Sequence, residues 1–138
     1  MGNLDSGIYV LKILLKNTQE IKVGALGRNK FAEGFYYYIG SAQKNLQSRV
    51  KRHLKDKKNF HWHIDYLLDK ADVVDYYTVE GPKNYECKLF NYLNNKDELK
   101  IMLEDFGSSD CSCVSHLLFS KENINIKNIL PEFKKSIQ

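Results

Sequence analysis

The chain has 138 residues, the length of one globular domain with room for a substantial core. Hydrophobic residues make up 43% of it, and glycine and proline are few, so the composition favours a folded globule over a disordered chain. No apolar run reaches the roughly 18 residues of a membrane-spanning helix, and the first residues lack a signal-peptide pattern. We therefore expect an intracellular, cytoplasmic protein without membrane contact.

Basic residues are concentrated in one short segment. Residues 44–58 contain seven Lys or Arg and one Asp, which gives a local charge of +6. Because the whole chain carries a net charge of +4, the remainder sums to −2. A compact basic patch on a nearly neutral body is typical of a surface that binds a polyanion such as nucleic acid.

The first part of the chain is predicted to form strands around a long loop. Residues 7–15 are almost continuously apolar and indicate a central strand, and residues 21–23 are predicted to return beside it as a hairpin partner. Residues 24–35, with glycines among charged residues, are predicted to be a loop. Residues 35–39 are rich in tyrosine and predict a third strand.

Helices dominate the middle of the chain. The spacing of Leu46, Val50 and Leu54 predicts a helix in the basic segment. The elements expected after it are a helix at 60–68, a strand at 72–80, a helix at 84–93, a short helix at 99–103 and a strand at 114–119. We therefore predict one α+β domain at residues 1–120, with residues 121–138 as a lysine-rich tail that is packed on it or loosely attached.

Five residues are candidates for chemistry. Tyr9 and Tyr38 would meet if their strands are antiparallel neighbours, although tyrosines in strands are also ordinary packing residues. A catalytic tyrosine would need its pKa lowered from about 10, by a cation such as Arg49 or by a metal. Arg49 and His53 share one helix face, and an arginine fork suits phosphate. Glu86 continues an apolar stripe, where a carboxylate needs a cation or Mg²⁺, but a first-turn acid is also favoured by the helix dipole.

In this order, the motifs resemble those of the GIY-YIG nuclease superfamily. Gly-Ile-Tyr at 7–9 and Tyr-Ile-Gly at 38–40 are followed by the arginine, the histidine and one later glutamate. The chain is more closely similar to a small bacterial and archaeal branch, formerly described as a domain of unknown function, with some members fused to DNA glycosylases. The motifs shared with that branch are Arg-His-Leu at 52–54, His-Trp-His-Ile-Asp-Tyr-Leu at 61–67, Glu-Cys at 86–87 and the segment 106–117.

The resemblance implies a fold, a metal and a set of roles. The fold would be a central three-stranded antiparallel sheet flanked by helices, with an inserted loop or hairpin between the first and second motif strands. Glu86 would bind one Mg²⁺ or Mn²⁺ ion. Tyr9 would activate water, and Tyr38 would orient the nucleophile. Arg49 would neutralise charge on the phosphate, and His53 would assist a proton relay or hold the phosphate.

Two features depart from the family pattern. The two motif tyrosines are 29 residues apart, farther than in most members, so residues 16–34 form an insertion that would shape a substrate groove. Many members also carry an asparagine after the metal-binding glutamate. Asn91 is only five residues beyond Glu86, and Ser109 and Asp110 are the other candidates for that place.

Further candidates for nucleic-acid contact lie in the basic segment and in the second predicted helix. They are Lys44, Lys51, Arg52, Lys55, His61, His63 and Asp65. His61 and Asp65 are one turn apart and able to pair with each other, and Trp62 and Tyr66 are predicted to be core residues. The alternative is that nucleic-acid bases stack on the histidines and Trp62.

The cysteines allow two interpretations. Three cysteines, an odd number without a secretory signal, argue against a disulfide framework. A loop with buried thiols is the first interpretation, and a zinc site is the second. The ligands of that zinc site would be Cys87, Cys111, Cys113 and His116.

The sequence therefore predicts a metal-dependent endonuclease that hydrolyses phosphodiester bonds of DNA in repair or recombination, with a DNA-repair protein as a candidate partner. The alternative is a non-catalytic nucleic-acid-binding module that retains the nuclease fold. RNA stays open as a substrate, because no residue distinguishes a reader of the 2′-hydroxyl.

Overall fold

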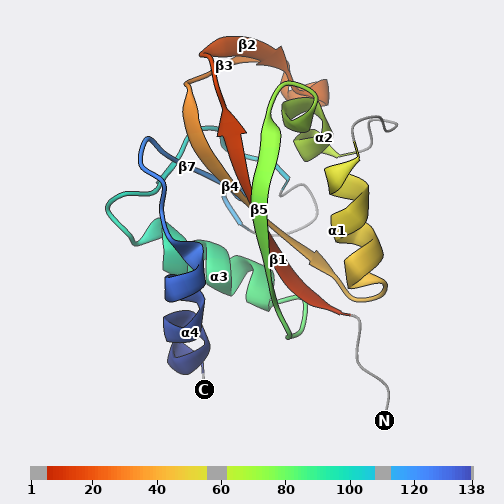
Figure 1. The fold of residues 1–138 in the computed structure, drawn as a ribbon, viewed down its shortest axis with the longest axis vertical. Coiled ribbons are helices and arrows are strands. Elements are labelled where there is room, and N and C mark those ends of the chain that lie inside the picture. Colours follow the sequence, from red (N-terminus) through yellow and green to blue (C-terminus); the bar gives the residue numbers. More distant parts are fainter. Residues whose placement is uncertain (1–5, 56–61, 108–112, 138) are drawn as a thin grey trace.

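The computed structural model describes residues 6–55, 62–107 and 113–137, which form a mixed α+β fold (Figure 1). The strands are β1 (Gly7–Leu15), β2 (Gln19–Lys22), β3 (Arg28–Phe31), β4 (Gly34–Ala42), β5 (Asp72–Val79), β6 (Lys100–Ile101) and β7 (Leu117–Ser120). The helices are the 3-10 helix η1 (Gly24–Leu26) and the α-helices α1 (Leu46–Leu54), α2 (His63–Leu68), α3 (Tyr85–Asn94) and α4 (Ile126–Ser136). No helix in these ranges is long and apolar enough to cross a membrane.

The main sheet has five antiparallel strands in the order β5-β1-β4-β7-β6. The α+β class is confirmed, but the predicted sheet of three strands was too small. The short helix predicted at 99–103 was wrong, because Lys100 and Ile101 pair with Phe119 and Leu118 as the edge strand β6. A two-residue strand carries no periodicity that a sequence pattern can detect.

The hairpin predicted between residues 7–15 and 21–23 was also wrong. All nine residues of β1 pair with β4 on one side, and most of them pair with β5 on the other. The four residues of β2 instead pair with β3 in a separate two-stranded sheet that lies between β1 and β4 in the chain. A long apolar strand buries both faces only in the centre of a sheet, so β1 takes the two longest partners.

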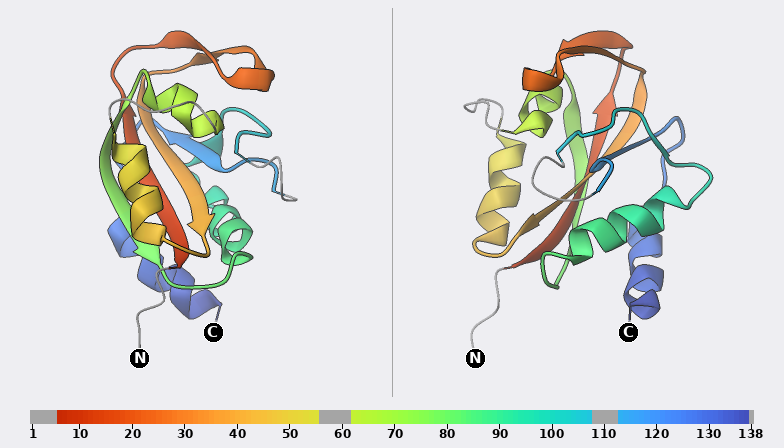
Figure 2. Two further views of the ribbon diagram at one scale, coloured as in Figure 1. Left: turned by 90° about the vertical axis from the view of Figure 1, so that its right-hand side faces the viewer. Right: turned by 180° about the vertical axis from the view of Figure 1, so that it is seen from behind.

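Helices cover both faces of the main sheet (Figure 2). Alternate residues of β1 point to opposite faces, so Tyr9 and Leu11 pack with α1 and α2, whereas Ile8 and Val10 pack with α3 and α4. The C-terminal segment, for which the sequence allowed packed or loose attachment, forms α4 and buries three apolar side chains against the sheet. These are Ile126, Leu130 and Phe133.

Candidate functional site

A polar cleft of about 430 Å³ opens between the ends of β1 and β4, the start of α2 and the start of α3. Four of the five predicted catalytic residues line it, although they come from four different elements. They are Tyr9, Tyr38, Arg49 and Glu86. The fifth, His53, is buried behind the phenol of Tyr9.

The strand register brings the two tyrosines together. Tyr9 of β1 lies opposite Gly40 of β4, and Leu11 lies opposite Tyr38, so both phenols point to the same sheet face. Their ring centroids are 6.2 Å apart. A Cβ atom at Gly40 would collide with the ring of Tyr9, so glycine is the residue that leaves space for the phenol.

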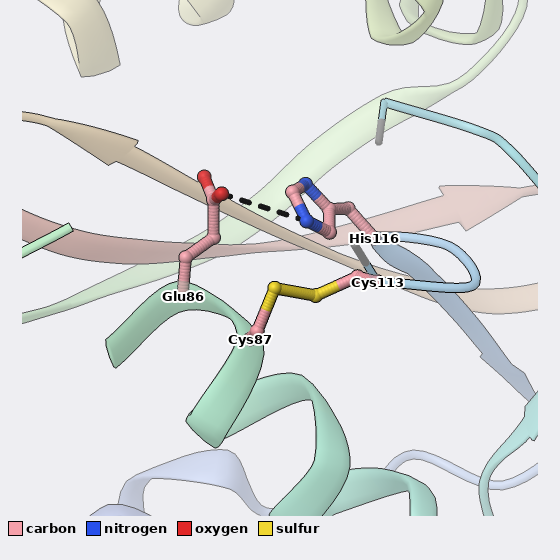
Figure 3. The surroundings of a disulfide bond; sticks show 4 residues. All are labelled: Glu86, Cys87, Cys113 and His116. Atoms are coloured by element: carbon pink, nitrogen blue, oxygen red, sulfur yellow. Dashed lines mark ion pairs between the residues drawn. A yellow bond between two sulfur atoms is a disulfide. The ribbon is translucent and has the colours of Figure 1, made fainter. Parts of the chain in front are cut away.

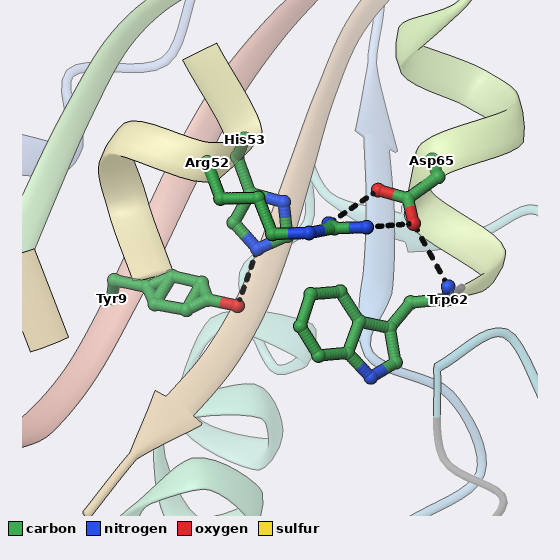
Figure 4. A network of polar contacts seen from close by, with 5 residues as sticks. All are labelled: Tyr9, Arg52, His53, Trp62 and Asp65. Atoms are coloured by element: carbon green, nitrogen blue, oxygen red, sulfur yellow. Dashed lines mark hydrogen bonds and ion pairs between the residues drawn. The ribbon is translucent and has the colours of Figure 1, made fainter. Parts of the chain in front are cut away.

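The hydroxyl of Tyr9 and Nε2 of His53 share a hydrogen bond of 2.8 Å (Figure 4). Burial raises the pKa of the Tyr9 phenol above its ordinary value, and the positive charge of Arg49 only partly opposes this shift. Burial also raises the pKa of Tyr38 well above its ordinary value, with smaller contributions from nearby negative charge. Both phenols are therefore neutral near pH 7, because burial raises their pKa by more than the charge of Arg49 lowers it. A proton leaving Tyr9 would need an acceptor such as His53.

Arg49 is half-buried in the wall of the cleft. One guanidinium nitrogen donates to the carbonyl oxygen of Ser41 at 3.2 Å. The guanidinium carbon lies 4.6 Å from the centroid of the Trp62 ring, a cation–π contact. These contacts fix the planar fork at the cleft, where an anion would be met by a delocalised charge.

Arg52 and Asp65 bind each other (Figure 4). The two guanidinium nitrogens donate to the two carboxylate oxygens at 2.9 and 3.0 Å, and Asp65 is fully buried. The same carboxylate accepts the backbone N–H of Trp62 at 2.9 Å, which caps α2. The Arg52–Asp65 pair therefore holds in place the start of α2, which forms part of the cleft wall. His61, the predicted partner of Asp65, lies outside the described residues.

The other residues predicted to contact nucleic acid are exposed lysines near α1 and one histidine in the cleft. Lys44, Lys51 and Lys55 are exposed on and around α1. His63 lines the cleft, and its Nδ1 accepts the backbone N–H of Gly107 at 2.8 Å. Burial lowers the pKa of His63, so its imidazole is neutral near pH 7.

Glu86 is buried in the first turn of α3 at the edge of the cleft. Its Oε1 lies 3.5 Å from Nε2 of His116 (Figure 3). Among the described residues that line the cleft, Glu86 is the one carboxylate. A Mg²⁺ ion is ordinarily held by one or two carboxylates, with waters and substrate phosphates filling the other positions, so this donor fits Mg²⁺ or Mn²⁺.

Cys87 and Cys113 form a disulfide, with Cα atoms 5.8 Å apart (Figure 3). The sequence argument against a disulfide was therefore wrong. The two residues are 26 positions apart and meet because the start of α3 packs beside the segment that leads into β7. Counting cysteines cannot detect such a contact, and Cys111 lies outside the described residues.

The cleft also contains residues outside the predicted site set, among them Lys83 and Gly107. Trp62, for which core packing and base stacking were the alternatives, is half-buried in the cleft wall. Gly107 has a φ of +72°, and a Cβ atom there would lie 2.9 Å from the Tyr38 ring. One usable signal was present for Trp62, since an aromatic residue shortly after two arginines offers them a cation–π partner.

Fold and cleft together define a small α+β protein in which a polar cleft holds two tyrosines, an arginine and a carboxylate. The chain belongs to the family described as domain of unknown function DUF123, whose model matches residues 8–138. That match includes every element from β1 to α4 except the first residue of β1, Gly7. No curated protein and no solved structure matches the chain.

Proposed function

We propose that this protein is a divalent-metal-dependent endonuclease that hydrolyses phosphodiester bonds of DNA in repair or recombination. One observation carries the proposal: the tyrosines, the arginine and the carboxylate that the nuclease pattern requires line one cleft, although they are distant in sequence. They are Tyr9, Tyr38, Arg49 and Glu86. The resemblance to GIY-YIG nucleases supports the same assignment.

Tyr9 and His53 supply a route for the proton of the attacking water. A neutral phenol donates its proton to Nε2 of His53 while its oxygen accepts a proton from water, the logic of a nucleophile with an adjacent base. The raised pKa of Tyr9 makes the His53 partner necessary, because the phenol does not ionise by itself near pH 7. Tyr38, beside Tyr9, orients the same water.

Arg49 and Glu86 act on the phosphate side of the reaction. Arg49 donates its fork of N–H groups to the phosphate oxygens as negative charge develops on them. Glu86 would hold Mg²⁺ or Mn²⁺, which when bound supplies Lewis-acid stabilisation of that charge.

The exposed lysines of α1 contact the DNA backbone. Lys44, Lys51 and Lys55 lie on the element that also carries Arg49, or directly beside it, so a duplex held by them passes the cleft. Contacts of this kind read charge and not sequence, which fits a partner such as a DNA-repair protein that supplies the choice of target.

A second candidate is a non-catalytic nucleic-acid-binding module. It is favoured by the two departures from the family pattern, which are the insertion at residues 16–34 and the lack of an asparagine at the expected distance after Glu86. The two candidates differ in whether bonds are cut after binding.

A cleavage assay separates them. Single-stranded, duplex and branched DNA are incubated with Mg²⁺ or Mn²⁺ and the parent protein, Glu86→Gln or the matched control Glu80→Gln, whose carboxylate is exposed outside the cleft. We expect cutting to fall by about 10²-fold or more in Glu86→Gln, with DNA binding retained and the control unchanged. Binding without cutting by the parent protein under either metal would instead establish the binding module.

A further inference from the structure

The start of α3 and the segment before β7 bring three candidate zinc ligands together beside Glu86 (Figure 3). The ligand atoms of Cys87, Cys113 and His116 all lie within 4.8 Å of one another. Ligands of one tetrahedral zinc ion, with Zn–S near 2.3 Å and Zn–N near 2.0 Å, are separated by roughly 3.5 Å. Small side-chain movements, with the sulfurs parted, would therefore suffice to surround an ion.

Two of the three ligands are held firmly by the fold. His116 is buried, its backbone N–H donates to the carbonyl of Phe106 at 2.8 Å, and its carbonyl accepts from Ile39 N–H at 2.9 Å. Cys87 lies in the first turns of α3, which packs on the sheet. A thiolate near a helix N-terminus is stabilised by the positive end of the helix dipole. Ligands fixed in advance lose little freedom when an ion arrives.

The third ligand gives access to solvent. Cys113 is half-buried, so its sulfur is open to reagents and metal from solvent. Two thiolates and an imidazole are a soft donor set that suits zinc and does not suit Mg²⁺.

We propose that Cys87, Cys113 and His116 bind one Zn²⁺ ion when the thiols are reduced, and that formation of the Cys87–Cys113 disulfide releases it. The disulfide in the structure and the zinc site use the same two sulfur atoms, so the two states exclude each other. The fourth zinc position is filled by water, which leaves the carboxylate of Glu86 to the proposed Mg²⁺ or Mn²⁺ ion.

The chemistry of the exchange balances with a peroxide as oxidant. Two zinc-bound thiolates lose two electrons in total and form the S–S bond. The O–O bond of hydrogen peroxide accepts those electrons and, with two protons, becomes two water molecules, while Zn²⁺ leaves. In the reverse direction a dithiol reductant returns two electrons and two protons to the sulfurs, and Zn²⁺ displaces the protons as it binds.

The test measures metal and needs no nuclease activity. The full chain is reduced, loaded with zinc and freed of excess metal, and then treated with hydrogen peroxide in the presence of a chromogenic chelator. We expect about one zinc per chain before peroxide and its release as two thiols disappear by titration. Absence of zinc from the reduced chain, or retention of zinc after the disulfide has formed, would overturn the proposal.

A matched pair of variants assigns the ligand. Cys113→Ser removes one sulfur, and Val114→Ser changes the exposed neighbouring side chain without touching the cluster. We expect Cys113→Ser to weaken zinc binding by more than the roughly 10–100-fold cost of losing an outer-shell partner, and Val114→Ser to bind as the parent does. Equal affinity in Cys113→Ser and Val114→Ser would contradict the assignment.

Cobalt provides a measurement that does not depend on whether the variant folds. Co²⁺ bound by thiolates gives a sulfur-to-metal charge-transfer band in the near ultraviolet. We expect this band in the reduced parent chain and its loss upon peroxide treatment, as the sulfurs leave the metal. Absence of the band from the reduced chain loaded with Co²⁺ would show that the sulfurs are not ligands.

Discussion

Arg49 and Arg52 lie three residues apart on α1, yet their surroundings differ. Arg52 donates two hydrogen bonds to the fully buried carboxylate of Asp65, so its charge is matched by a charge inside the protein. Arg49 donates to the neutral carbonyl of Ser41 and lines the cleft. Two arginines of one helix therefore differ in their surroundings: Arg52 is paired with a buried carboxylate, and Arg49 holds its positive charge in the wall of the cleft.

Trp62 contacts both arginines. Its ring lies 4.6 Å from the guanidinium carbon of Arg49 and 4.4 Å from that of Arg52. Its backbone N–H is bound by the carboxylate of Asp65, which fixes the start of α2. The Arg52–Asp65 pair thus positions the ring of Trp62, against which Arg49 packs. An ion pair outside the cleft therefore helps to fix the position of Arg49 within it.

The largest expected effect concerns Arg49. If Arg49 stabilises the phosphate as proposed, Arg49→Ala lowers the cleavage rate by about 10²–10³-fold, equivalent to roughly 2.7–4 kcal/mol of barrier. The free energy of unfolding should fall by only about 1–2 kcal/mol, because the variant loses a hydrogen bond to a neutral carbonyl and a cation–π contact but leaves no buried charge without its partner. Single-turnover cleavage and urea denaturation measure the two quantities.

Lys51→Ala is the matched control for Arg49→Ala, because Lys51 is an exposed cation on the same helix and does not line the cleft. It should weaken DNA binding in a salt-dependent way and leave the rate of bound substrate unchanged. Equal losses of rate in both variants would mean that Arg49 acts only through general charge.

Arg52→Ala should give the opposite profile. It leaves Asp65 buried without its bidentate partner, and we expect the free energy of unfolding to fall by roughly 3 kcal/mol. This is the lower end of the usual range, since the Arg52 side chain is 26% exposed and partly screened. Urea denaturation measures the loss.

The double variant Arg52→Met, Asp65→Leu should recover part of that stability, because replacing both partners removes the uncompensated buried charge. A single variant Arg52→Ala as stable as the parent protein would place Arg52 with Arg49 and remove the contrast between them.

The sequence predicted which residues line the cleft better than it predicted the contacts that hold those residues in place. The sequence predicted that Tyr9 and Tyr38 meet on the condition that their strands are antiparallel neighbours, and the pairing of β1 with β4 meets that condition. Nothing in the pattern separated Arg49 from Arg52, since both lie in one basic helix. The partner of Arg52 is 13 residues away on another helix, and only tertiary packing decides which arginine meets it.

The predictions of which distant segments pair with each other failed for the same reason. The segment after β1 was expected to fold back on it, but β1 selected β4 and β5, whose lengths match its own. The contact between Cys87 and Cys113 likewise depends on where α3 docks. Local patterns predict the type of an element, whereas the identity of its neighbours depends on the whole core.

The smallest expected effect concerns His63 in the cleft wall, whose imidazole interacts with Gly107 and also with the backbone and the negative charge of Asp105. Its Nδ1 accepts from Gly107 N–H, which requires that nitrogen to be unprotonated, and burial lowers its pKa below the ordinary value of 6.5. The unfolded chain therefore binds the proton more readily. This part of the stability is fully present above about pH 6.5 and is lost as the pH falls toward the lowered pKa of the folded state.

Urea denaturation at about pH 7.5 and about pH 5 measures this loss, and His63→Asn is the informative variant. Its side-chain oxygen can accept the same N–H from Gly107 but does not titrate, so the decrease in stability on the acid side should shrink. An unchanged pH dependence in His63→Asn would mean that the titration of His63 does not cause the loss of stability on the acid side. Because His63 is half-buried and neutral in the folded protein, its effect should be smaller than the loss in Arg52→Ala, where a buried charge is left without its partner.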